Sequence, residues 1–176
     1  MASAPLVSVS TTVMSHEDGA ACVDAVRRLF PNFLPNFEAN EPAGFPAANG
    51  RVQLDCDDCD TVAFIEQMAE ARILDTGLDA MSMHLKGRET WFLLSRQAAV
   101  AGKVAFVLPG ERSLGGVIRV KLQGADLGEW LTEATWHPGR LDVPRDVADD
   151  VSMRRDGAVT EWFDKHGRPT IQTDED

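Results

Sequence analysis

Two cysteines, Cys56 and Cys59, have a spacing that could support metal binding or redox chemistry. A structural zinc site needs four ligands, usually from a second such pair or from two histidines. The chain adds only Cys22 and four scattered histidines. A reactive thiol needs surroundings that lower its pKa, whereas aspartates flank this pair at positions 55, 57, 58 and 60. We therefore expect two incidental cysteines at a strand-to-helix turn, and no bound zinc.

Catalytic motifs are absent from the sequence. It contains no phosphate-binding loop, no dinucleotide-binding glycine pattern and no nucleophile elbow. Glu17 and Glu70 are possible acid–base groups, but helix-surface positions explain both. The sequence therefore predicts a protein that is not an enzyme and that uses no cofactor or metal.

Charge is distributed unevenly along the chain. The net charge is -11, from 28 acidic and 17 basic residues, a balance typical of proteins that work in concentrated salt, although an ordinary acidic protein is the alternative. Residues 1–71 carry -8, residues 72–121 carry +4 and residues 122–176 carry -7. Residues 72–121, the basic segment, indicate an anionic partner.

The basic segment supplies the candidate binding residues. Its cations either flank predicted helix ends or project from one face of the predicted strand 117–122, and a glutamine between them could hydrogen-bond to sugar or base edges. The structural alternative is that each cation is solvated or paired, as Arg72 would be with Asp75 or Asp79. The candidate RNA-binding residues are Arg72, Arg96, Gln97, Lys103, Arg119 and Lys121.

Hydrophobic periodicity predicts the elements that position these residues. Alternating or continuous apolar residues indicate strands at 6–13, 51–55, 89–94, 103–108 and 117–122. Helical spacing indicates a helix from Ser15 to about Phe30, another running from 61 to about 85 through Gly77, and a short one at 96–100. We expect a common core of Val7, Val9, Leu74, Leu78, Met81, Phe92, Leu94, Phe106, Ile118 and Val120.

The change of composition after Trp136 predicts two regions. Residues 1–136 are expected to form a single α+β domain, and residues 137–176 an acidic, partly disordered C-terminal tail, with 138–157 solvated and removable. No signal peptide or membrane-spanning stretch is evident, so we expect a soluble cytoplasmic protein.

Two motifs resemble a known family. They are the run from Arg72 to Thr76 and the turn containing Gln97, Ala98, Ala99, Gly102, Lys103, Val104 and Phe106. Together they resemble uncharacterised protein family 0201, an archaeal family. With the first strand, the helix end at Leu29, Phe30 and Pro31, and the pair Leu114 and Gly115, the resemblance covers roughly residues 6–123. Members carry Ala-Arg where this chain has Gly77 and Leu78, and Asn-Lys where it has Ser95 and Arg96. The lost arginine after Thr76 weakens that helix as a cation site.

The resemblance implies both a fold and a role. The implied fold is a mostly antiparallel sheet with helices packed on one face, like the large-subunit ribosomal protein that binds 5S RNA. The implied role is RNA binding, and the implied assembly is a homodimer. Fold likeness alone does not fix function.

Two hypotheses remain open from the sequence. The first is recognition of structured RNA by its shape, because tyrosine is absent and base stacking is poorly supplied. The second is a dimeric protein-interaction scaffold whose first strand is a sheet edge and whose tail docks through Trp162 and Phe163.

Overall fold

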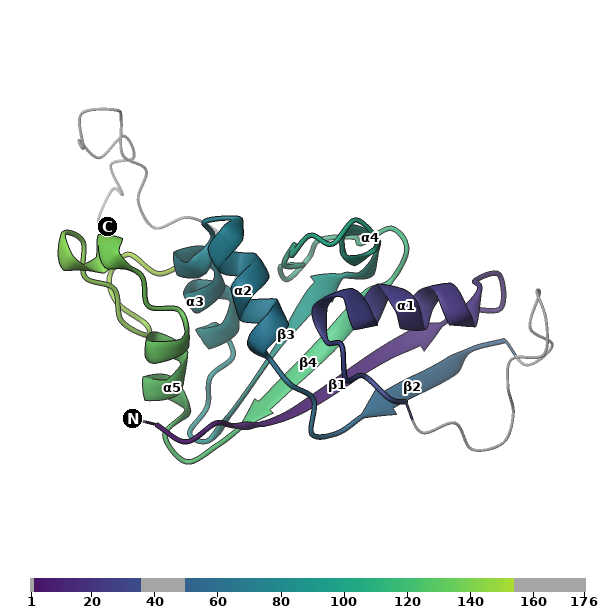
Figure 1. Cartoon of the computed structure of the whole chain (residues 1–176), viewed down its shortest axis with the longest axis horizontal. Coiled ribbons are helices and arrows are strands. Elements are labelled where there is room, and N and C mark those ends of the chain that lie inside the picture. The colour runs from purple at the N-terminus through teal and green to yellow at the C-terminus, as the bar shows by residue number, and fades with distance from the viewer. Residues whose placement is uncertain (1, 36–49, 154–176) are drawn as a thin grey trace, which may run out of the picture.

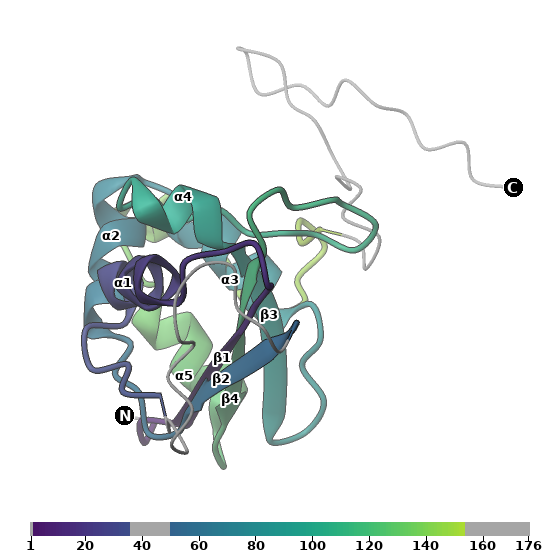
Figure 2. The same ribbon diagram turned by 90° about the vertical axis from the view of Figure 1, so that its right-hand side faces the viewer.

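A computed structural model describes residues 2–35 and 50–153. Within these residues, four antiparallel strands form one sheet in the order β2-β1-β4-β3, and helices lie against one of its faces (Figures 1 and 2). The α+β class and the antiparallel sheet are confirmed. The strands are β1 (Leu6–Val13), β2 (Val52–Cys56), β3 (Glu89–Ser95) and β4 (Val117–Gln123), and the helices are α1 (Gly19–Leu29), α2 (Val62–Glu70), α3 (Leu74–Ser82), α4 (Arg96–Val100), α5 (Leu127–Ala134) and the 3₁₀ helix η1 (Pro138–Leu141).

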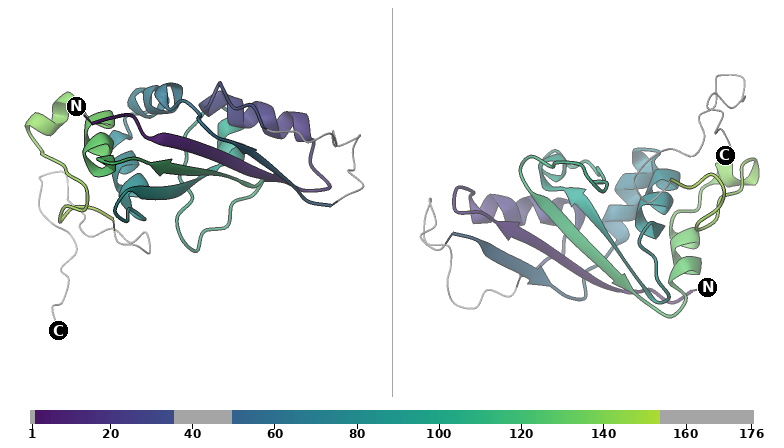
Figure 3. Two further views of the ribbon diagram at one scale, coloured as in Figure 1. Left: turned by 90° about the horizontal axis from the view of Figure 1, so that it is seen from below. Right: turned by 180° about the vertical axis from the view of Figure 1, so that it is seen from behind.

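Alternation along the strands separates the two faces of the sheet. In β1, Val7 and Val9 are buried beneath the helices, while Ser8 and Ser10 lie on the other face. Pairing in register places Val9 beside Val120 of β4, and Ser10 beside Arg119. Views from below and behind show the same division into a helix-covered face and a face without helices (Figure 3). The predicted core is buried as expected, except that Phe106 is only partly buried.

The interior position of β1 corrects one expectation. β1 pairs with β2 on one side and with β4 on the other. It is therefore not the sheet edge that the scaffold hypothesis requires. The predicted docking residues Trp162 and Phe163 lie outside the described residues.

The predicted helix over 61–85 is two helices. α2 ends at Glu70, α3 begins at Leu74, and Arg72 between them has a φ of 58°. This left-handed conformation breaks the helical hydrogen bonds and turns the chain. Gly77 serves close packing, because a Cβ there would lie 2.6 Å from the Sδ atom of Met68.

Three smaller corrections concern element boundaries. α1 begins at Gly19 because Asp18, rather than Ser15, caps it by accepting hydrogen bonds from the N–H groups of Ala20 and Ala21. Residues 103–108 form no regular strand, and only Phe106 bridges to β3. α5 was not predicted at all. Within residues 2–35 and 50–153, no helix combines the length and apolar character needed to cross a membrane.

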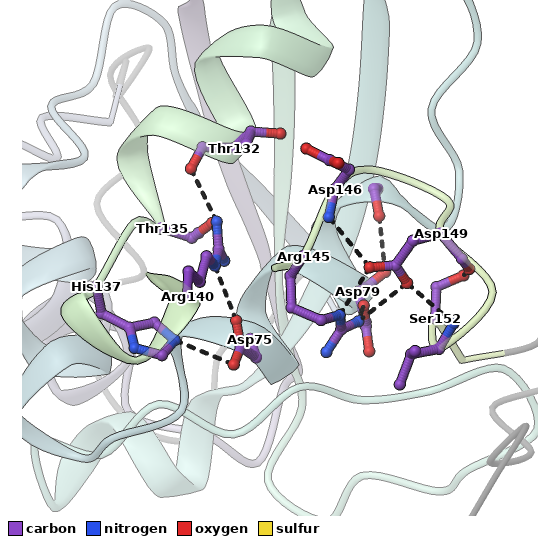
Figure 4. Close-up of polar contacts among 12 residues, drawn as sticks. Asp75, Asp79, Thr132, Thr135, His137, Arg140, Arg145, Asp146, Asp149 and Ser152 are labelled. Atoms are coloured by element: carbon purple, nitrogen blue, oxygen red, sulfur yellow. Dashed lines mark hydrogen bonds and ion pairs between the residues drawn. The ribbon is translucent and has the colours of Figure 1, made fainter. Parts of the chain in front are cut away.

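Residues 137–153 pack on the domain through two arginines. Arg140, nearly buried, donates from Nε to Asp75 Oδ1 at 3.0 Å, and from its two terminal nitrogens to Thr132 O and Thr135 Oγ1 (Figure 4). Arg145 donates to Asp79 Oδ1 at 2.6 Å. These contacts do not agree with the expectation that residues 138–153 are solvated and removable; residues 154–157 lie outside the described part.

Arg96 is buried at the end of the sheet opposite to residues 137–153. Its side chain is 3% exposed and donates to Thr11 Oγ1, the carbonyl oxygens of Thr12 and Gly115, and the carboxylate of Glu17. We call these groups the Arg96 cluster. It joins β1, the start of α1 and the turn before β4.

Gly116 leaves the space that Arg96 occupies. Its φ is +80°, and a Cβ there would lie 2.6 Å from the Arg96 guanidinium. Gly110 has a similar φ of +84° but open space around it. We expect Gly116→Ala to lower the free energy of unfolding by about 2 kcal/mol more than Gly110→Ala. Both variants strain a left-handed backbone conformation, but only Gly116→Ala also displaces a buried ion pair. Urea unfolding of the two variants measures the difference, and equal losses would contradict the tight fit.

Candidate nucleic-acid interface

The face of the sheet without helices presents polar and cationic side chains. Because side chains alternate along a strand, the residues between the buried positions all point to this side. We call it the open face, and define it by Ser8, Ser10 and Thr12 of β1, Gln53 and Asp55 of β2, Trp91 and Leu93 of β3, and Arg119 and Lys121 of β4.

Trp91 is the aromatic centre of the open face. The guanidinium carbon of Arg119, on the neighbouring strand, lies 4.5 Å from the centre of the Trp91 ring, within cation–π range. The His84 ring, from the turn after α3, stacks on the same residue with centres 3.9 Å apart and planes 20° apart. These contacts fix the orientation of all three side chains.

These side chains help to line a cavity of about 320 Å³. We call it the cationic pocket; it is lined by His84, Lys86, Glu89, Thr90, Trp91, Arg119 and Lys121. Among the described residues, Glu89 is the one carboxylate that lines it, and the Lys121 ammonium lies 2.6 Å from that carboxylate, with both side chains about half exposed. Three permanent cations thus face one carboxylate, which leaves a positive balance for an anion.

The structure separates the six predicted binding residues. Arg119 and Lys121 lie together on the open face. Gln97 is an exposed residue of α4, and Lys103 lies just beyond that helix, while Arg72 sits in the turn between α2 and α3. None of these three lines the cationic pocket.

Arg96 does not fit the predicted role. Its guanidinium is enclosed within the Arg96 cluster and is 3% exposed, so it has no surface left for a phosphate. The alternative considered for Arg72, an ion pair with Asp75 or Asp79, is not found among the described residues, because Asp75 pairs with Arg140 and Asp79 with Arg145.

Five residues that line the cationic pocket were not predicted from the sequence: His84, Lys86, Glu89, Thr90 and Trp91. The apolar run 89–94 indicates a buried strand, whereas Trp91 and Leu93 point together to the open face in the structure. The alternation of side chains along the strand could have identified Trp91. His84 lies at the pocket because its ring stacks on Trp91, and no local sequence pattern predicts a tertiary contact of this kind.

The cysteine pair lies away from the open face, in the core. Cys56 and Cys59 are buried and form no disulfide. Burial, followed by the neighbouring Cys56, raises the pKa of Cys59 to about 12, so this thiol stays protonated and unreactive. Among the residues that the structure describes, no three His, Cys, Asp or Glu side chains are grouped to hold a metal ion.

Comparisons with known sequences point to one group of archaeal proteins. No family model matches the chain. A UPF0201 protein of Sulfurisphaera tokodaii is 36% identical over 75 residues, which are 41% of this chain and 52% of that protein, so this match spans about half of the relative's length. A UPF0201 protein of Methanothermobacter thermautotrophicus is 25% identical over 143 residues, covering 81% of this chain and 98% of the relative.

Solved structures share the fold. The crystal structure of a UPF0201 protein from Methanococcus jannaschii matches 74% of this chain and 99% of its own, with a TM-score of 0.63 and 20% identity. A second UPF0201 crystal structure matches 72% of this chain and 90% of its own, with a TM-score of 0.57 and 19% identity. At this level of identity the likeness concerns the fold.

Proposed function

The chain belongs to the UPF0201 family, and we propose that it is a non-catalytic RNA-binding protein that recognises structured RNA through the open face of its sheet. The observation that carries the proposal is the cationic pocket, where Arg119 and Lys121 project beside Trp91 from adjacent strands. The implied likeness to the ribosomal protein that binds 5S RNA supports the same conclusion by analogy.

The chemistry of the pocket suits a phosphate backbone. Arg119 offers a planar fork of donors and Lys121 a mobile point charge, and both kinds of group bind phosphate oxygens in proteins. Contacts of this kind set the position of the nucleic acid and supply most of the affinity. The hydroxyls of Ser8 and Ser10, paired in register with Lys121 and Arg119, extend the polar surface across β1.

The sheet geometry suits RNA better than a single small anion. Antiparallel four-stranded sheets with one uncovered face bind RNA in common modules by combining aromatic and cationic side chains. Here the Trp91 ring already contacts Arg119 and His84. Backbone contacts are therefore expected to dominate over stacking of successive bases, which favours structured RNA.

The acidic flanks are compatible with this proposal at high ionic strength. Residues 1–71 and 122–176 carry -8 and -7, and long-range repulsion of RNA by these regions is screened when the Debye length falls to about 3 Å in molar salt. Close contacts in the cationic pocket survive such screening. We propose that the protein works in the cytoplasm of a salt-adapted cell, and binding should therefore be measured from low to molar salt.

The combined change of Arg119→Gln and Lys121→Gln tests the proposal. We expect about 10- to 100-fold weaker binding to a structured RNA hairpin at low salt, because two charge-assisted contacts are lost. The slope of log affinity against log salt should fall by about 1.4 to 1.8, the share of two phosphate contacts. Fluorescence anisotropy with a labelled hairpin measures both quantities.

A matched control removes the same charge from the helix-covered side. Arg28 and Arg72 are exposed there, and changing both to glutamine should leave the affinity within about twofold. Glu89→Gln should act in the opposite direction and strengthen binding, because it removes the carboxylate of the pocket. If the parent binds no hairpin at any salt concentration, or if both double variants weaken binding equally, RNA recognition by the open face is wrong.

A further inference from the structure

A second, smaller cavity adjoins the cationic pocket. It has a volume of about 130 Å³ and lies between the end of α3, β3 and residues 106–109. Its walls include Phe92, Phe106, Leu108 and Pro109, and it shares His84 and Trp91 with the cationic pocket. We call it the ring pocket.

The ring pocket has the size and lining of a site for one aromatic ring. An apolar cavity of roughly 150 Å³ lined by aliphatic and aromatic side chains holds a benzene molecule, whereas drug-sized ligands occupy roughly 300–1,000 Å³. The volume of about 130 Å³ therefore suits a single six-membered ring and is small for a fused pair. The ring pocket is open on one side, so the polar edge of a bound ring keeps contact with water.

The ligand is indicated by the two cavities together. The ring pocket is an apolar space for one ring, and the stack of His84 on Trp91 separates it from the three cations of the cationic pocket. This arrangement is complementary to an apolar ring attached to an anion. In an RNA, each nucleotide carries these two parts. A base is available for such a pocket where it is unpaired and extruded from the helix, as in a bulge.

On the basis of the proposed function, we propose that the ring pocket binds a single unpaired pyrimidine base of a structured RNA. The adjacent phosphate then lies among Lys86, Arg119 and Lys121. The pocket selects by size, since its lining is mostly apolar and offers few groups to read the base edge. Uracil and cytosine are therefore bound alike, and adenine and guanine are bound less tightly. The ligand class is an RNA stem that carries a single-nucleotide pyrimidine bulge.

Three hairpins with the same stem test this inference on the unmodified protein. One has no bulge, one has a single bulged uridine and one has a single bulged adenosine. We expect the uridine hairpin to bind about 5- to 100-fold more tightly than the unbulged hairpin, the range found for stacking of one base on aromatic side chains. The adenosine hairpin should gain less. A bulged 5-fluorouridine should also show a changed ¹⁹F chemical shift in the complex.

A filled pocket provides the matched variant. Val107 lines the ring pocket but not the cationic pocket, and Leu114, in the following loop, lines neither and is 81% exposed. Val107→Phe should abolish the advantage of the uridine hairpin and leave the unbulged hairpin unaffected. Leu114→Phe should change neither.

The outcomes separate the two proposals. Equal affinity for all three hairpins, with a normal salt slope, would overturn the ring pocket as a base site while RNA binding stands. If the unmodified protein binds none of the three hairpins, the proposed function is overturned and this inference with it. A preference for the adenosine hairpin would also contradict the inference, because it would require a larger site. The hairpin comparison needs no variant, so it does not depend on how well Val107→Phe folds.

Discussion

Replacement of Arg96 by alanine is expected to lower the free energy of unfolding by about 3–5 kcal/mol. The guanidinium is 3% exposed, and its removal leaves the partly buried Glu17 carboxylate without its partner. It also leaves Thr11 and the carbonyl of Gly115 without a donor. Breaking a buried ion pair from one side costs this much because an uncompensated charge stays behind.

Chemical unfolding compares this variant with Arg28→Ala. Arg28 is an exposed arginine of α1, and its replacement should change stability by less than about 0.5 kcal/mol. Arg96→Lys should fall between the two, because an ammonium retains the charge but lacks the planar fork. If Arg96→Ala is as stable as Arg28→Ala, the Arg96 cluster does not hold β1 to the turn before β4.

The stability that the Arg96 cluster provides depends on pH, and the direction of this dependence follows from the pKa of Glu17. Burial raises the pKa of Glu17, but the N–H of Met14 and the Arg96 guanidinium outweigh burial and hold the pKa below its usual value. The stabilisation is therefore complete at neutral pH and is lost as the pH falls through the lowered pKa. Arg96→Ala should lose less stability on acidification than the parent.

Ending the chain at Trp136 is expected to cost about 3–5 kcal/mol. This change removes Arg145, the ion-pair partner of Asp79, which is 8% exposed in the full chain. Burial raises the pKa of Asp79, and Arg145 opposes that rise. The same change removes Arg140 from its hydrogen bonds to Asp75 and Thr135.

A chain ending at Met153 is the control for this truncation. It keeps both arginines and their partners, and its melting temperature should match that of the full chain. The two point variants Arg140→Ala and Arg145→Ala should each account for part of the loss. A chain ending at Trp136 that melts at the parent temperature would restore the sequence-based boundary and assign no stability to residues 137–153.

The four strands of the sheet were predictable because their signal is local, whereas the apolar run 103–108 lacks the ladder of a regular strand. β1 alternates valine and threonine with serine, so the buried and exposed faces can be assigned from the sequence alone. The same pattern in β4 predicted Arg119 and Lys121 on one exposed face, where the structure places them, while their role in binding stays a prediction.

The remaining features depend on tertiary contacts. The apolar stripe from Leu74 to Leu85 continues the helical spacing of α2, and nothing in it reveals that Arg72 adopts a left-handed conformation. Arg96 and Arg140 look like solvated cations in sequence, and only partners 79 and 65 residues away show that they are buried. The roles of charged residues are set by such distant partners.

The measurement that tests RNA binding by the open face most directly is a titration of the ¹⁵N-labelled protein with a structured RNA hairpin, followed by NMR. The account predicts that the indole N–H of Trp91 and the Nε–H of Arg119 shift, while the indole N–H of Trp130, in α5 on the helix-covered side, stays in place as an internal reference. Shifts confined to α1 and the turn around Arg72, with Trp91 unchanged, would contradict the account.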